Sequence, residues 1–117
     1  MTASHREATL RALYQAFNDR DIDRVLAAMT PDVDWPNGWE GGRLVGHAEV
    51  RSYWERQWTQ IRPTVRVTRF QDNANGTAEV RVRQVFRDPG GAVLERSDVT
   101  HLYEFVGDRI RRMSVKQ

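Results

Sequence analysis

The sequence contains no cysteine, which excludes disulfide bonds, thiolate nucleophiles and cysteine-ligated zinc within these 117 residues. Lysine is almost absent too, because Lys116 is the only one and arginine supplies the rest of the 18 basic residues. The arginines are scattered from Arg6 to Arg112 and nearly balanced by 16 acidic residues, so the formal net charge is only +2. This balance gives little support for a polyanion partner. We expect no nucleic-acid partner and rank nucleic-acid binding through the arginines last among the functions considered.

Long apolar runs are also missing. No stretch approaches the length of a membrane span, and residues 1–5 carry no apolar segment of the kind found in signal peptides. With the absence of cysteine, this predicts a cytoplasmic protein with no membrane partner. At 117 residues the chain is long enough to bury a substantial core, and we expect a single domain covering residues 1–117.

Metal and cofactor motifs are not found either. The three histidines, His5, His47 and His101, have no paired spacing that would hold a metal ion. No serine sits in a nucleophile-elbow pattern, and no glycine-rich loop has the spacing that cradles a phosphate. We therefore expect no metal and no cofactor.

The N-terminal part has the pattern of two amphipathic helices and a strand. A first helix over residues 5–18 is predicted because apolar side chains recur at helical intervals: Leu10, Leu13, Tyr14 and Phe17. Asp21 is placed to cap a second, shorter helix, which Thr30 and Pro31 should end. Val33 and Trp35 then alternate with aspartates, which predicts a short strand up to Pro36.

The remainder predicts a glycine-rich loop, a third helix and a sheet. The helix should run from His47 to Pro63, with one apolar side made of Val50, Tyr53, Trp54, Gln57, Trp58 and Ile61. After it, apolar and polar residues alternate along four segments separated by turns at residues 73–76, 88–91 and 107–108. The order indicates an α+β fold, in which a cone-shaped, curved antiparallel sheet wraps around three N-terminal helices and leaves a pocket at its wide end.

Three segments carry a family resemblance: Phe17-Asn18-Asp19-Arg20-Asp21, Asp32-Val33-Asp34-Trp35 and Gly46-His47-Ala48-Glu49-Val50. In these the chain resembles the nuclear transport factor 2-like superfamily, and within it the small bacterial SnoaL-like proteins, relatives of polyketide cyclases and ketosteroid isomerase. The resemblance implies a cystatin-like roll over essentially the whole chain, a hydrophobic pocket and a homodimer. Because the superfamily includes isomerases, cyclases, dehydratases, hydrolases and proteins without catalysis, it leaves open whether this chain is an enzyme.

The catalytic residues of a ketosteroid isomerase-like member are mostly not matched. Its general base is a carboxylate before the proline of the first strand, where this chain has Trp35, and indole accepts no proton at neutral pH. Its helix tyrosine corresponds to a position one residue from Tyr14, an offset of about 100° around a helix. Tyr14 is therefore not treated as equivalent, but is kept as a possible orienting donor. A late-strand acid corresponds to His101.

His101 is the candidate acid or base. If Tyr103 and Phe105 face the core, the two-residue period of a strand also turns His101 inward, into aromatic surroundings. The alternative is a histidine that is merely packed and hydrogen-bonded within the fold. Gln84 interrupts an apolar strand face, so it should either pair within the fold, with His101 for example, or contact a ligand.

Large aromatic side chains are the other candidate ligand contacts. Rings of this kind suit a flat, largely apolar ligand, and the predicted contacts, with Gln84, are Trp35, Trp39, Trp54, Trp58 and Tyr53. Trp39 lies in the glycine-rich loop, which would form a lid. The alternative for these rings is plain core packing.

Apolar residues are also expected on the outer face of the sheet, where they favour a two-fold dimer: Phe70, Val85, Leu94 and Leu102. The leading hypothesis is a small-molecule pocket protein for an apolar, aromatic or polycyclic ligand, with cofactor-independent acid–base chemistry of isomerase, cyclase or dehydratase type if it is catalytic. The alternative is a non-catalytic dimeric module that binds a ligand or another protein.

Overall fold

The computed structural model describes residues 2–116, with side chains described from residue 5 onward. This part of the chain forms three helices and one sheet of six strands: α1 (Thr2–Asn18), α2 (Ile22–Ala27), β1 (Met29–Pro36), β2 (Arg43–Val45), α3 (His47–Gln60), β3 (Arg62–Asp72), β4 (Ala78–Arg87), β5 (Val93–Val106) and β6 (Arg109–Lys116). The predicted α+β class is confirmed. Within residues 2–116 no helix has the length and apolar character needed to cross a membrane.

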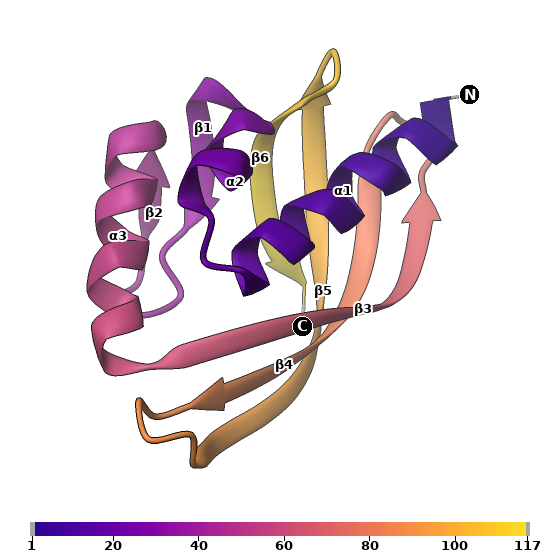
Figure 1. Ribbon diagram of the computed structural model, residues 1–117. Helices are drawn as coiled ribbons and strands as arrows, with labels where there is room; N and C mark the ends of the chain where they lie inside the picture. Colours follow the sequence, from indigo (N-terminus) through magenta and orange to yellow (C-terminus); the bar gives the residue numbers. More distant parts are fainter. Residues whose placement is uncertain (1, 117) are drawn as a thin grey trace.

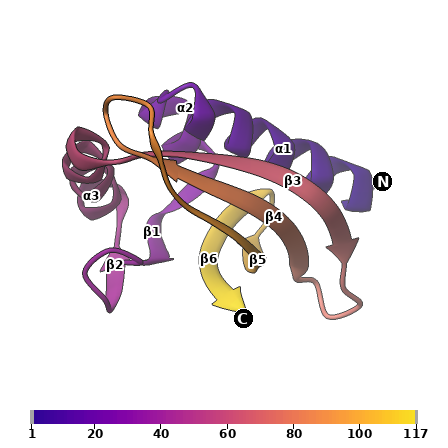
Figure 2. The ribbon, with the colours of Figure 1, turned by 90° about the horizontal axis from the view of Figure 1, so that it is seen from below.

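The sheet has the strand order β2-β1-β6-β5-β4-β3 and is curved but not closed. Neighbouring strands pair antiparallel, as predicted, except that β1 runs parallel to β6. Strands β3 to β6 follow one another through short turns and form one long curved surface (Figure 1). Helix α1 lies along the concave side of this surface, as Figure 2 shows from below, and α3 stands beside the short strand β2.

The core lies between the helices and the concave face of the sheet. Helix α1 contributes the buried side chains of Leu10 and Leu13 to this core. The sheet contributes side chains that are completely buried: Val80, Val82, Tyr103 and Ile110. The two-residue period of β4 and β5 produces this arrangement, since every second side chain points to the same face. The same period turns alternate residues of both strands to the convex face.

Several element boundaries differ from the sequence prediction; α3, for example, ends at Gln60, and Pro63, predicted as the end of this helix, lies in β3. Two further differences concern β1 and β2. The second helix ends at Ala27, because Met29 pairs with Ile110 of β6 and begins β1, although Met29 fits the helical apolar pattern. The predicted cap is present, since the Asp21 carboxylate accepts a hydrogen bond from the backbone N–H of Arg24 at 3.3 Å. Residues 43–45, predicted as the end of a loop, form strand β2 opposite Trp35. Both differences come from strand pairing, which local patterns do not contain.

Phe70 was predicted on the outer face of the sheet, and the structure corrects this. A β-bulge between Val67 and Arg69 inserts one extra residue and shifts the alternation of β3. Phe70 therefore lies opposite Val80 and packs against the core, whereas Arg69 points outward opposite Arg81.

Asn18, at the end of α1, fixes the position of the edge strand β3. Its side-chain amide donates to the carbonyl of Val65 at 2.8 Å and accepts the N–H of Val65 at 2.9 Å. The amide thus satisfies both backbone groups of Val65 on the open edge of the sheet. It holds α1 against β3 in the way a neighbouring strand would.

Replacing Asn18 by alanine should lower the free energy of unfolding by about 1–3 kcal/mol, because both backbone groups of Val65 lose their partner in a half-buried place. Urea unfolding measures this. The matched control is Gln15→Ala on the same helix, whose exposed side chain contacts only Asp19 and whose loss should change stability by less than about 0.5 kcal/mol. Equal effects of the two substitutions would contradict the role given to Asn18.

Candidate functional site

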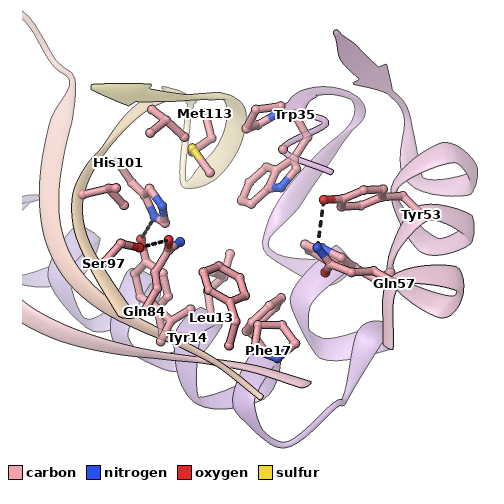
Figure 3. A pocket seen from close by; sticks show the side chains of 18 of the residues that line it. Leu13, Tyr14, Phe17, Trp35, Tyr53, Gln57, Gln84, Ser97, His101 and Met113 are labelled. Atoms are coloured by element: carbon pink, nitrogen blue, oxygen red, sulfur yellow. Dashed lines mark hydrogen bonds between the residues drawn. The ribbon is translucent and has the colours of Figure 1, made fainter. Parts of the chain in front are cut away.

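A cavity of about 400 Å³ opens between α1, α3 and the concave face of the sheet. Most of its wall is apolar and aromatic, and Figure 3 shows Leu13 and Phe17 of α1, Trp35 of β1 and Met113 of β6 around it. Trp35 and Trp54 meet edge to face with ring centroids 5.8 Å apart. The volume lies within the range of about 300–1,000 Å³ that is usual for sites binding small molecules.

His101 forms the polar end of this cavity together with two tyrosines. The hydroxyl of Tyr14 lies 2.8 Å from His101 Nδ1 and 2.6 Å from the hydroxyl of Tyr103 (Figure 3 shows the first contact). Among the described residues His101 Nε2 has no hydrogen-bond partner, yet it is not sealed from solvent, so this nitrogen faces the cavity. The inward direction predicted for His101 is confirmed by its 5% exposure.

Burial makes this polar end uncharged at neutral pH. It lowers the pKa of His101 from the ordinary 6.5 to about 4, so the imidazole is neutral at pH 7. Burial likewise raises the pKa of the Tyr14 and Tyr103 hydroxyls, which stay protonated. Three neutral hydrogen-bonding groups therefore stand in one row at the inner end of the cavity.

Gln84 lines the same end but does not pair with His101. Its carbonyl oxygen accepts a hydrogen bond from the hydroxyl of Ser97 at 3.2 Å, on the neighbouring strand. Its amide nitrogen has no partner within the part of the chain that the structure describes. Gln84 was predicted either to pair within the fold or to contact a ligand. Its carbonyl oxygen pairs within the fold, and its amide nitrogen is left available to donate to a ligand.

A second polar pair lies on the opposite side of the cavity. Gln57 of α3 donates to the hydroxyl of Tyr53, one helical turn earlier, at 3.0 Å. Figure 3 shows this pair facing His101 and Gln84 across the apolar middle. Glu95, an exposed residue of β5, is the one carboxylate among the described residues that line the cavity.

The structure brings together six of the eight residues predicted for the site. The cavity wall contains Tyr14, Trp35, Tyr53, Trp54, Gln84 and His101. The one-residue offset of Tyr14 along its helix does not turn it away from the cavity, since its hydroxyl reaches His101. Whether any of these residues acts on a ligand stays a prediction.

Two predicted ligand contacts lie elsewhere. Trp58 stacks on Trp54 at 5.8 Å with the rings nearly parallel, and the guanidinium of Arg20 covers it at 5.1 Å, so it packs behind the cavity wall. Trp39 is 42% exposed, does not line the cavity, and has its ring centroid 6.5 Å from that of Tyr53. Its loop is turned outward by Asn37, whose side-chain oxygen accepts the N–H of Trp39. The helical period that groups Trp54 with Trp58 does not say which of the two faces the cavity.

Three polar members of the site were missed in the sequence: Gln57, Ser97 and the hydroxyl of Tyr103. Signals exist for two of them: Gln57 lies one helical turn after Tyr53, and Tyr103 shares a strand face with His101. Ser97 has no such signal. Counting back from the turn at residues 88–91 would place Glu95 opposite Gln84, and only the register shift between Phe86 and Arg87 brings Ser97 there.

Comparison with known proteins now identifies the family. The sequence model of a SnoaL-like domain matches residues 10–113. The chain belongs to the SnoaL-like family. The matched part of this SnoaL-like protein includes the cavity-lining residues of α1, α3 and the sheet as far as Met113. A comparison with curated proteins found no match.

Solved structures with the same fold include several with bound compounds. This SnoaL-like protein is similar to TerC co-crystallised with polyporic acid, at TM-score 0.83 and 24% identity over 96% of this chain and 90% of that one. A nuclear transport factor 2-like protein of unknown function from Burkholderia pseudomallei has TM-score 0.83 and 24% identity over 96% and 89%. A Mycobacterium tuberculosis protein in complex with estradiol-17beta-hemisuccinate has TM-score 0.82 and 15% identity over 97% and 93%. These likenesses establish the fold.

The burial of neutral His101 predicts a loss of stability in acid. In the unfolded chain an imidazole binds its proton below about pH 6.5, whereas folded His101 does so only below about pH 4. The folded state is therefore penalised increasingly as the pH falls from 6.5 to 4, by on the order of 3 kcal/mol in total.

Urea unfolding of the wild type and of His101→Gln, compared at pH 7 and pH 4.5, measures this loss. The variant lacks the imidazole, so it should lose clearly less stability over this range than the wild type. The same loss in both proteins would show that His101 is not held neutral by the fold.

Proposed function

We propose that this SnoaL-like protein binds a small, largely apolar compound with an aromatic or polycyclic framework in the cavity. The proposal rests on the cavity wall, which is apolar over most of its area, includes aromatic rings, and has one row of neutral hydrogen-bonding groups at its inner end. Such a wall favours flat rings in the middle and a single polar group next to His101. Because the inner end carries no charged side chain, that polar group is uncharged, such as a carbonyl or a hydroxyl.

The direction of the hydrogen bonds follows from the buried position of Tyr103. If Tyr103 donates to Tyr14 and Tyr14 donates to His101 Nδ1, all three groups are satisfied and the proton of His101 sits on Nε2. In the opposite direction the completely buried hydroxyl of Tyr103 would have no acceptor among the described residues, which is costly. The first direction therefore places an N–H donor at the cavity surface.

This N–H donor favours polarisation of a carbonyl over removal of a proton. A general base works best with a pKa near the operating pH, whereas burial holds the pKa of His101 at about 4. A neutral imidazole that donates from Nε2 polarises a ligand carbonyl by hydrogen bonding to its oxygen. If the protein is an enzyme, we propose cofactor-independent isomerisation, cyclisation or dehydration of this kind, with Tyr14 fixing the orientation of His101.

Two of the three ligand complexes among similar structures agree with the proposed ring framework, whereas the third holds trimethylamine, which has no ring. One neighbour was co-crystallised with polyporic acid and another was solved with estradiol-17beta-hemisuccinate. Both compounds are built on rings and carry oxygen. They are suitable first probes for this chain.

Filling the cavity tests the binding proposal. Val99 of β5 lines the cavity, so Val99→Trp should occupy part of the space and weaken binding of polyporic acid or estradiol-17beta-hemisuccinate at least about tenfold, measured by titration calorimetry. The matched control is Val106→Trp on the same strand, which is 56% exposed and lies outside the cavity wall. Equal affinities of the two variants, or no binding of either probe to the wild type, would contradict the proposal.

We also propose that two copies pair through the outer face of β5 and β6. Leu102 lies in the middle of the sheet on this face, between Glu79 and Ser114 of the neighbouring strands, and is only half-buried. A two-fold pair would cover it.

Light scattering of the purified protein tests the pairing. The wild type should have the mass of two chains, and Leu102→Asp should have the mass of one, whereas Val45→Asp, a change at an exposed valine of β2, should stay paired. A wild type that is monomeric at high concentration would overturn the dimer.

A further inference from the structure

The convex face of β3 and β4 carries arginines directly opposite one another. The strand register pairs Arg62 with Arg87, Arg66 with Arg83, and Arg69 with Arg81. Arg96 of β5 adjoins them opposite Val85. We name this surface the arginine face and define it by seven residues: Arg62, Arg66, Arg69, Arg81, Arg83, Arg87 and Arg96. These residues alternate along the strands with core-facing ones such as Val65 and Val82, so their side chains lie on the side of the sheet turned away from α1.

Like charges that face each other across two strands destabilise a sheet, because their side chains start about 5 Å apart. Only one arginine of the face has an acidic partner among the described residues, namely Arg83, which contacts Asp98 at 3.1 Å. Arg81 reaches a neutral oxygen, the hydroxyl of Thr100, at 3.3 Å. The fold thus carries a concentrated positive charge, of which Asp98, close to Arg83 and Arg81, neutralises only a part.

Most arginines elsewhere on this protein have an acidic partner. Seven of the ten contact a carboxylate: Arg6, Arg11, Arg24, Arg43, Arg51, Arg56 and Arg112. Among the described residues Arg20, Arg109 and Arg111 have none, but they are not opposed to one another across paired strands as the arginines of the face are. In the sequence these arginines look scattered, and only the register of β3 with β4 brings them together.

The centre and the end of the arginine face are apolar. Val85 lies in the register between Thr64 and Arg96, with arginine pairs on either side along the strands. Val93, at the start of β5, lies opposite Arg87 and is 41% exposed. Arginine around an apolar centre is the composition of a protein–protein interface.

Two other occupants fit this face less well. A second copy placed on it by a two-fold axis would bring arginines against arginines. Single-stranded nucleic acid binds on aromatic platforms, and none of the described residues that point outward here is aromatic. The dimer proposed above is centred on β5 and β6 and leaves the arginine face at its margin.

We propose that the arginine face is a docking surface for an acidic surface of another protein, with carboxylates that engage the arginine pairs around an apolar group seated on Val85. Arginine suits this role because its planar guanidinium binds a carboxylate through two parallel hydrogen bonds. This surface is separate from the cavity and does not depend on the proposed ligand.

A fluorescent helical peptide of glutamate and leucine, 20 residues long, serves as the acidic probe. Its binding by fluorescence anisotropy should weaken at least about tenfold in Arg66→Glu/Arg69→Glu and less than about threefold in the matched control Arg109→Glu/Arg111→Glu, which changes the net charge equally at exposed arginines of β6. Equal weakening in both variants, or no binding to the wild type at low salt, would overturn the proposal. Tighter, face-dependent binding of a single-stranded oligonucleotide than of the peptide would overturn the assignment to a protein partner.

A stability measurement separates docking from a structural role. Because Arg66→Glu places a carboxylate opposite Arg83, it should raise Tm by about 1–5 °C while it weakens peptide binding. A lower Tm in Arg66→Glu would show that the arginine pairs do not oppose folding, and the argument for a retained docking surface would fail.

Discussion

The hydrogen-bonded row Tyr103–Tyr14–His101 is the interaction on which the rest of the site depends. Its three polar groups are buried in an aromatic interior, where each must find a partner or destabilise the fold. Tyr14 provides this partner from α1, and Asn18, one helical turn further on, holds β3 from the same helix. The position of α1 across the sheet and the position of His101 in the cavity are therefore set together.

The cavity remains open because the groups around it are fixed by other contacts. Trp54 is packed between Trp35 and Trp58, and Phe17 stands edge-on to both Trp54 and Trp58 at 5.4 Å, so these rings are held at one side. On the other side the curvature of β4 and β5 carries Gln84 and His101 away from them. Closing the space would require these packed rings to give up their contacts.

The sequence predicts much of this fold and part of the site, and the physical reasons are visible in single residues. The strand period turns His101 inward, and the helical period places Tyr14 on the buried side of α1, because both depend on local geometry. Their hydrogen bond joins residues 87 positions apart, which no local pattern contains. Strand pairing likewise decides that Met29 is in β1, that a bulge turns Phe70 inward, and that scattered arginines become opposed pairs.

The central claim is that the fold holds His101 neutral, with its proton on Nε2 and directed into the cavity. Nitrogen-15 NMR of the imidazole, with the signals assigned by their loss in His101→Gln, tests it directly at pH 7. The account predicts that Nε2 carries the proton, that Nδ1 does not, and that a ligand carbonyl in the cavity shifts the Nε2 resonance. A proton on Nδ1, or on both nitrogens, would reverse or abolish the hydrogen-bonded row and contradict the account.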